Sequence, residues 1–185
     1  QNKLLKTLEE PPAGVHFLLG ATSLAPVLDT VKSRVKLLEI PPFSERDIYD
    51  ALERRGRSEL NAAAAKSANG ILGAAENMVE GGWFKEVLTA AEEICGVTEV
   101  GKIGITAAKY GDIKYKNELL GEMQRIYFDA LAGGGRSPLS PHALVFALER
   151  LVAAFADVKF NAFFQGLLYD FMLEVVRENE KWQKL

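Results

Sequence analysis

The sequence predicts a mostly α-helical protein in which a short mixed segment, with two strands, precedes a purely helical remainder. From residue 43 onward, apolar residues recur at three- and four-residue spacing, and no stretch there has the pattern of a strand. Before residue 43, two short apolar runs lie at residues 15–21 and 35–40, each beside turn-forming residues or prolines. With 185 residues, 48% of them hydrophobic, the chain is long enough to bury a sizeable core.

The first 42 residues are expected to alternate between helix and strand. Residues 1–10 predict an amphipathic helix, which the proline pair at 11–12 prevents from continuing. Residues 15–21 suit a buried parallel strand that is covered on both faces. A short helix over residues 25–32 then leads to a second strand over residues 35–40. Because no initiator methionine or capping residue precedes the first helix, we expect the chain to be a piece of a longer protein.

Residues 43–82 predict a group of three short helices. Ser44 is a suitable N-cap, and acidic residues follow it in the first turn. Glycine-containing turns separate the helices, which we expect at residues 44–55, 58–67 and 71–79. A group of about 40 residues is small for an independent domain, so we expect it to dock on its neighbours.

The remainder, residues 83–185, predicts an all-α bundle of longer helices. A glycine-rich loop at residues 132–138 is the clearest flexible connection, and Ser140 and Pro141 form a typical helix start. The predicted domains are therefore residues 1–42, 43–82 and 83–185. The bundle helices are expected at residues 83–95, 97–110, 113–131, 141–156 and 161–180.

Charge and cysteine content argue against several classes of function. The net charge of −3 and pI near 5.5 give no electrostatic footprint for tight, autonomous nucleic-acid binding, which would need a basic face, although they leave room for local basic patches. Cys95 is the single cysteine, and His16 and His142 are distant in sequence, so neither a disulfide nor a cysteine-histidine metal site is expected. This usage is typical of a cytoplasmic protein. No apolar stretch is long enough to span a membrane, and no secretory signal is present.

The sequence also lacks the usual elements of a self-sufficient catalyst. There is no phosphate-binding G-x-x-x-x-G-K-[ST] loop, and the glycine cluster at residues 133–135 lies between predicted helices. Paired acidic residues such as Glu9 and Glu10 are most simply explained as solvent-facing helix positions. We therefore expect no cofactor in this chain and no catalysis by the chain alone.

One arginine stands out by its position. Thr22 follows the first predicted strand, and in open α/β sheets ligands bind at the carboxyl ends of strands. Arg34 lies twelve residues later, between a short helix and the second predicted strand. From the residues alone, Arg34 is either a surface arginine beside a helix C-terminus or a guanidinium that projects toward a ligand.

The N-terminal residues resemble the clamp-loader subunits of bacterial DNA polymerase III, which carry AAA+ domains. Residues 1–12 (QNKLLKTLEEPP) resemble the helix after the Walker B strand of that family. Residues 17–22 (FLLGAT) resemble its sensor 1 strand, and residues 30–35 (TVKSRV) its S-R-C motif, at fitting spacing. The resemblance is dense over residues 1–42, weaker over the predicted lid, and limited in the bundle to a pattern at residues 157–161 (DVKFN).

The resemblance implies roles for individual residues. Arg34 takes the place of the family's trans-acting arginine finger, which stabilises charge on the γ-phosphate of ATP-Mg bound by a neighbouring subunit. Ser33 is its motif partner, and Thr22 takes the sensor 1 position. Val35 stands where the family has cysteine. The implied architecture is a remnant of an AAA+ α/β core, a three-helix lid and a helical collar.

The sensor 2 position indicates which subunit the chain resembles. Catalytic lids carry arginine in a G-x-x-R-x-A pattern, whereas residues 70–75 read GILGAA, with Gly73 in place of arginine. This implies the delta-prime type of subunit, which hydrolyses no ATP itself but belongs to a DNA-directed DNA polymerase holoenzyme. Two alternatives stay open: an ATP-hydrolysing gamma/tau subunit without its phosphate loop, or a helical interaction domain of another AAA+ protein.

The resemblance also implies partners. A collar would join the chain to gamma/tau and delta subunits, and indirectly to the sliding clamp and primed DNA, with no membrane involved. Aromatic and apolar side chains recur along the last predicted helix on a stripe wide enough to suggest an interface, although core packing would also explain most of them. The candidate interface residues are Phe160, Phe163, Phe164, Leu167 and Phe171.

Overall fold

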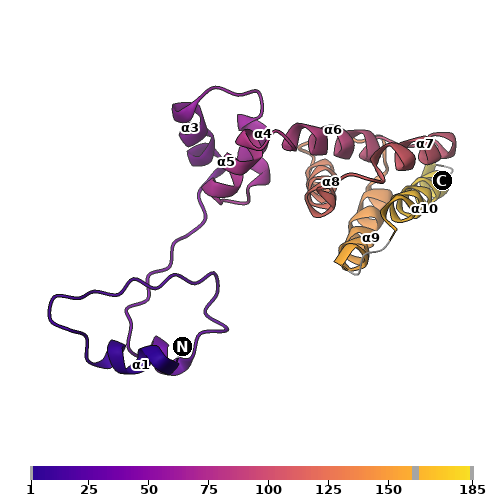
Figure 1. Ribbon diagram of the computed structural model, residues 1–185. Helices are drawn as coiled ribbons and strands as arrows, with labels where there is room; N and C mark the ends of the chain where they lie inside the picture. Colours follow the sequence, from indigo (N-terminus) through magenta and orange to yellow (C-terminus); the bar gives the residue numbers. More distant parts are fainter. Residues whose placement is uncertain (1, 160–162, 184–185) are drawn as a thin grey trace. The chain divides into compact units, whose positions relative to one another are not determined.

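The computed structural model describes residues 2–159 and 163–183, and the prediction of a mostly α-helical fold is confirmed there (Figure 1). The contacts divide the chain into one unit that ends at Pro41 and another that begins at Pro42. The first unit contains α1 (Asn2–Glu9) and α2 (Asp29–Lys32). The second contains α3 (Glu45–Arg55), α4 (Asn61–Ser67), α5 (Leu72–Glu80), α6 (Phe84–Cys95), α7 (Val100–Tyr110), α8 (Lys116–Leu131), α9 (Pro141–Lys159) and α10 (Phe164–Gln183).

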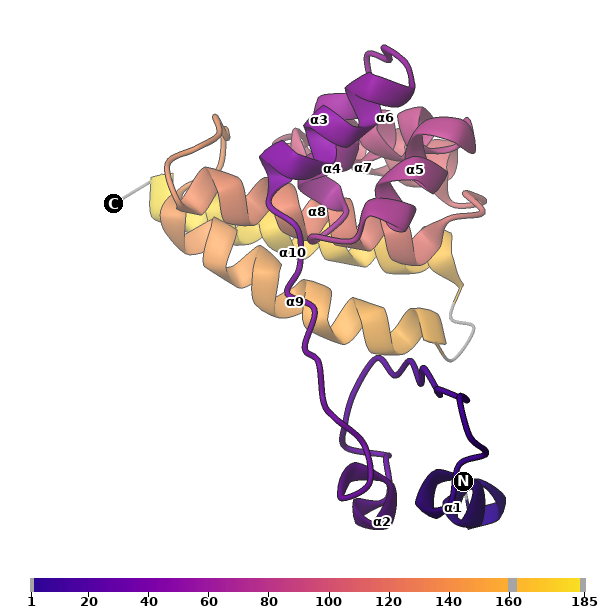
Figure 2. The same cartoon turned by 90° about the vertical axis from the view of Figure 1, so that its left-hand side faces the viewer.

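The first unit is held by contacts between its two helices, which lie side by side (Figure 2). Helix α1 agrees with the prediction, but α2 is shorter than predicted. Leu28 has an extended backbone with ψ of 138°, so the helix begins only after it. Val31 of α2 is the only buried apolar residue among the described side chains of this unit.

The two predicted strands are absent from the described residues, which corrects the prediction for residues 15–21 and 35–40. A strand is stable only when a neighbouring strand accepts and donates its backbone hydrogen bonds. The two runs do not pair with each other, and no other strand is described. Most of their apolar side chains are consequently exposed, completely at Leu18 and to 83% at Leu38.

Helices α3, α4 and α5 pack against one another and against the start of α6. Ser44 caps α3 as predicted, because its Oγ accepts a hydrogen bond from the backbone N–H of Asp47 at 3.1 Å. Phe84 of α6 is 1% exposed and completes the core of this group. The other members of that core are Ile48, Leu52, Ala64, Ala65, Ala68 and Ala75.

Gly70 closes the turn between α4 and α5. Its φ of +81° favours glycine, and a Cβ there would overlap the Cβ of Pro42 and lie 3.1 Å from the carbonyl oxygen of Phe43. The carbonyl of Gly70 also accepts a hydrogen bond from the N–H of Phe43 at 3.0 Å. This turn therefore fixes the start of the second unit against the α4–α5 connection.

We expect Gly70→Ala to lower the free energy of unfolding by roughly 1–3 kcal/mol, because alanine is strained at this φ and collides with Pro42. Gly73→Ala is the matched control, since Gly73 lies in α5 with no atom within 4 Å of an added Cβ. It should be neutral or stabilise by up to about 1 kcal/mol. Chemical denaturation followed by circular dichroism measures both effects, and equal stability of the two variants would contradict this description of the turn.

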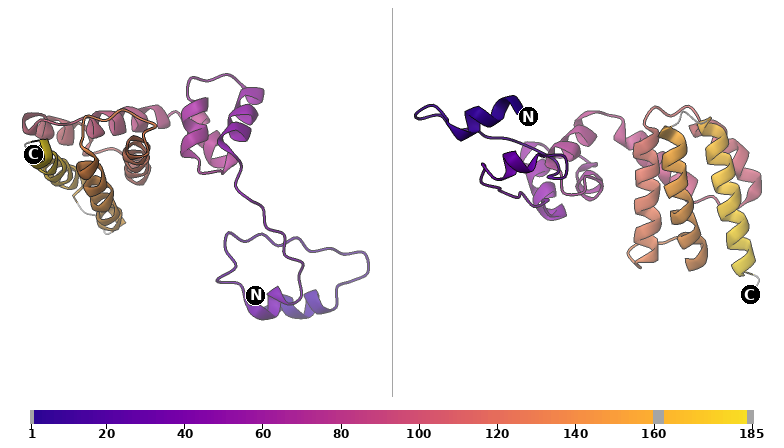
Figure 3. Two further views of the ribbon diagram at one scale, coloured as in Figure 1. Left: turned by 180° about the vertical axis from the view of Figure 1, so that it is seen from behind. Right: turned by 90° about the horizontal axis from the view of Figure 1, so that it is seen from below.

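Helices α6 to α10 form the bundle. Helices α8, α9 and α10 lie side by side, while α6 packs on α8 and α7 packs on α10 (Figure 3). Helices α7, α8 and α10 each begin three residues after the predicted start. For α7 and α8 the reason is visible, because Val97 and Ile113 are buried although they lie in the preceding turns. Asn161, the predicted start of α10, lies outside the described residues.

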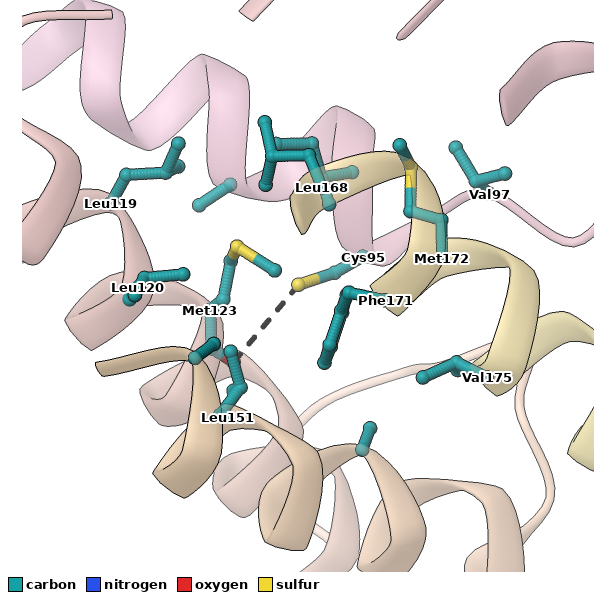
Figure 4. Packing of buried hydrophobic residues seen from close by; sticks show 14 of the residues in the cluster. Cys95, Val97, Leu119, Leu120, Met123, Leu151, Leu168, Phe171, Met172 and Val175 are labelled. Atoms are coloured by element: carbon teal, nitrogen blue, oxygen red, sulfur yellow. Dashed lines mark hydrogen bonds between the residues drawn. The ribbon is translucent and has the colours of Figure 1, made fainter. Parts of the chain in front are cut away.

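The bundle core is apolar and encloses the cysteine (Figure 4). Cys95 is buried among side chains that include Met123 and Phe171, and its Sγ lies 4.0 Å from the carbonyl oxygen of Met123. Burial raises the pKa of this thiol to about 12. Because the thiolate is the reactive form, Cys95 is a packing residue here and carries no chemistry.

Candidate functional site

The structure places Arg34 between the ends of the two helices of the first unit. Glu9 is the last residue of α1, since Pro11 and Pro12 cannot extend the helix. Arg34 follows Ser33, the C-terminal capping residue of α2. Contact between α1 and α2 therefore brings together two charged side chains that are 25 residues apart in the sequence.

All three guanidinium nitrogens of Arg34 have partners. Nε donates a hydrogen bond to Oε1 of Glu9 at 2.6 Å, and Nη2 forms an ion pair with the same oxygen. Nη1 donates to the carbonyl oxygen of Thr30 at 2.7 Å and to Oγ of Ser33 at 3.1 Å. The hydroxyl of Ser33 in turn donates to the carbonyl of Thr30 at 3.2 Å. The guanidinium is thus fixed from two sides.

The arginine is nevertheless accessible. Its side chain is 35% exposed, and that of Glu9 is 46% exposed. The bond to the Thr30 carbonyl is the contact expected of an arginine at a helix C-terminus, one of the two interpretations that the sequence left open. An oriented, accessible guanidinium is also what binding of a phosphate oxygen requires.

Thr22 and Gly73 are the other two positions that were named from the sequence. Thr22 is exposed in an irregular segment, and no hydrogen bond joins it to Arg34 in the described part of the chain. Gly73 lies in the other unit, in the first turn of α5, where it presents no side chain. Ser33, in the same unit as Arg34, accepts a hydrogen bond from Nη1 of the arginine.

The candidate interface residues of α10 divide into buried and exposed positions. Phe164 and Phe171 are 2% and 4% exposed, because they belong to the core of the bundle. Leu167 packs partly against that core. Phe163, just before α10, is 75% exposed, and Phe160 lies outside the described residues. Of the described set, Phe163 alone is largely available to a partner; Phe164 and Phe171 are anchors of the chain's own core.

Glu9 has a partner that the sequence did not indicate. It is an exposed helix position, as expected, and it also forms an ion pair with Arg34. A signal was present in the sequence, since the proline pair makes Glu9 the end of its helix, where the macrodipole disfavours a carboxylate. An acidic residue at that position is stabilised by a nearby cation, although the sequence does not indicate which one.

A separate groove of about 510 Å³ lies between the α4–α5 group and helices α6 and α8. Its lining includes Glu122, which is 5% exposed. Arg125 donates a hydrogen bond to this carboxylate at 2.8 Å and another to Asp129 at 3.0 Å. The arginine is therefore already neutralised by two carboxylates, and the groove offers no evident anion site.

Two further findings concern only the described residues. Among them, no group of three or more histidine, cysteine, aspartate or glutamate side chains is placed to hold a metal ion. No helix in the described ranges is both long and apolar enough to cross a membrane.

Comparison with known proteins gives two matches. The family described as "DNA polymerase III, delta subunit" matches residues 1–44 of the chain. The protein named "DNA polymerase III subunit gamma" from Buchnera aphidicola subsp. Schizaphis graminum (strain Sg) is 35% identical over 86 residues, which cover 43% of this chain and 24% of the relative. The chain thus spans about a quarter of the length of this curated relative. No solved structure matches the chain.

The two matches name different subunits of one assembly. The family match covers the segment that holds Thr22, Ser33 and Arg34, so the similarity is located where the candidate site lies. Together with the gamma-subunit relative, it supports a relationship of this chain to the clamp-loader subunits of DNA polymerase III.

Proposed function

We propose that this chain is a segment of a delta-prime-type clamp-loader subunit of bacterial DNA polymerase III. In this role the subunit hydrolyses no ATP itself and supplies Arg34 to ATP-Mg bound by a neighbouring subunit. The observation that carries the proposal is the match of residues 1–44, including Arg34, to the DNA polymerase III delta-subunit family. The proposed setting is the bacterial cytoplasm, during loading of the sliding clamp for DNA replication.

The chemistry of Arg34 suits the proposed role. Hydrolysis of ATP increases negative charge on the oxygens around the γ-phosphate in the transition state, and an oriented guanidinium stabilises that charge. The guanidinium of Arg34 is held by three residues, and 35% of its side chain is accessible. These properties support a role toward a phosphate that another subunit holds.

The lid position supports the non-hydrolysing type of subunit. Gly73 has no side chain that could reach a phosphate, and its surroundings are open, so no neighbouring residue fills the place of an arginine within 4 Å. The domain division that we propose is an AAA+ core segment at residues 1–42, a lid at 43–82 and a collar at 83–185. The collar would contact gamma/tau and delta subunits.

The gamma-type subunit is the second candidate, and the 35% identical gamma-subunit relative favours it. The two candidates differ in ATP hydrolysis by the isolated subunit. We expect the purified full-length subunit to show no hydrolysis above background, because the proposal gives it no sensor 2 arginine. The measurement is phosphate release with saturating ATP-Mg, with and without primed DNA. Turnover by the isolated subunit would instead assign it to the gamma type.

A helical interaction domain of another AAA+ protein is the remaining alternative. It makes a different prediction for assembly, since such a protein would not join the other clamp-loader subunits. Size-exclusion chromatography of the full-length protein mixed with gamma/tau and delta subunits therefore serves as the accompanying control. Separate elution would contradict the proposed function, whatever the hydrolysis measurement shows.

A further inference from the structure

We propose that Glu9 is a positioning residue for Arg34. Its carboxylate holds the Nε and Nη2 side of the guanidinium so that the group is oriented before a neighbouring nucleotide site meets it. The inference rests on the proposed function, because it concerns how Arg34 would be prepared for that role. It assigns a task to an acidic side chain that the sequence pattern presented as one of two solvated glutamates.

The position of Glu9 in its helix is the first observation. A carboxylate in the last turn of a helix faces the negative end of the macrodipole, which is an unfavourable placement. Glu9 is the last residue of α1, and the proline pair keeps it there. The ion pair with Arg34 offsets this unfavourable placement, so Glu9 has a structural partner that its own helix does not provide.

The arrangement of acceptors is the second observation. The carbonyl of Thr30 and the hydroxyl of Ser33 come from α2 and its cap, on the same short segment as Arg34. Glu9 approaches from α1 and contacts the two remaining nitrogens. Acceptors from two different helices reach all three nitrogens and so restrain rotation of the guanidinium plane. With acceptors on α2 alone, the plane would rotate more freely.

The third observation is the remaining exposure. A buried ion pair would sequester the arginine, but 35% of this side chain is accessible while the pair is formed. An unrestrained arginine loses side-chain entropy when it is immobilised. Orienting the group in advance removes part of that loss from the transition state.

A competing interpretation predicts the opposite effect of removing Glu9 on the rate of hydrolysis. Glu9 could instead hold Arg34 away from a phosphate, in which case removing the carboxylate would accelerate hydrolysis. The contacts favour positioning, because the Thr30 and Ser33 bonds would still hold Nη1 after Glu9 was removed, so Glu9 alone does not confine the arginine. What its removal changes is the orientation of the group.

The test uses the full-length subunit assembled with its clamp-loader partners, with ATP-Mg as substrate. Glu9→Gln keeps the size of the side chain but removes its charge, and Glu9→Ala removes the acceptor altogether. We expect each to lower kcat about two- to fivefold, the effect of losing a half-exposed ion pair. The KM for ATP should not change, since another subunit binds the nucleotide. Glu10→Gln is the matched control and should behave as the unaltered protein.

A double substitution separates this inference from the proposed function. In an Arg34→Ala background, Glu9→Gln should have no further effect on hydrolysis, because it acts through Arg34. Native mass spectrometry verifies that every variant assembles. An unchanged or increased kcat in Glu9→Gln, or an equal decrease in Glu10→Gln, would overturn the positioning role while leaving the role of Arg34 intact. If Arg34→Ala itself has no effect on hydrolysis, the proposed function fails independently of Glu9.

Discussion

Under the proposed function, replacing Arg34 by alanine is expected to reduce ATP hydrolysis by about a thousandfold at the neighbouring site that Arg34 would serve, the low end of the effect of an arginine finger. The reason is that the developing charge on the γ-phosphate would lose its one guanidinium partner from the adjacent subunit. Assembly should remain intact, since Arg34 is partly exposed and its guanidinium bonds to Glu9, Thr30 and Ser33 of its own unit. Arg34→Lys should rescue little, because an ammonium cannot reproduce the planar guanidinium.

The measurement is single-turnover hydrolysis by assembled complexes that carry either the unaltered or the substituted subunit. Arg46→Ala provides a matched control, because Arg46 is an exposed arginine in the first turn of α3. It should leave the rate unchanged. Equal rates for Arg34→Ala and Arg46→Ala in properly assembled complexes would show that Arg34 is only a surface arginine at a helix end.

Phe171→Ala is expected to give a large loss of stability. Phe171 is 4% exposed in the bundle core, where its ring lies 6.3 Å from that of Tyr127. Truncating a buried phenylalanine removes its packing and leaves a cavity, which typically costs about 3–5 kcal/mol. Urea denaturation should show a lower midpoint with an unchanged slope.

Phe163→Ala is the control for this prediction, because both phenylalanines were candidates for one interface stripe. Phe163 is 75% exposed, so its substitution should change the free energy of unfolding by no more than about 0.5 kcal/mol. Similar decreases in the free energy of unfolding for the two variants would contradict the division of this stripe into core and surface positions.

The helices were the most predictable part of the fold, and their errors have a physical cause. Apolar periodicity reports which side chains are buried, not which backbone is helical. Val97 and Ile113 are buried from turns, at 7% and 6% exposure, so they extended the helical pattern beyond the observed starts of α7 and α8. The capping of α3 by Ser44 was predicted correctly because it depends on local residues alone.

The strands and the site show where local patterns are insufficient. The runs at residues 15–21 and 35–40 have strand-like composition, but a strand needs a pairing partner that the described residues do not provide. The pair of Glu9 and Arg34 joins positions 25 residues apart, and only the packing of α1 on α2 brings them together. The sequence showed that the stripe along α10 is apolar. It could not show that Phe163 is exposed, because exposure depends on how the helices pack.

The most direct test of the central claim is complementation of hydrolysis. Gamma/tau and delta subunits are mixed with increasing amounts of the full-length subunit, and ATP hydrolysis is followed in the presence of primed DNA and sliding clamp. We predict that the unaltered subunit stimulates hydrolysis in proportion to the amount of complex formed, and that the Arg34→Ala subunit forms as much complex with far less stimulation. Equal stimulation by both subunits, or no stimulation by the unaltered one despite assembly, would contradict it.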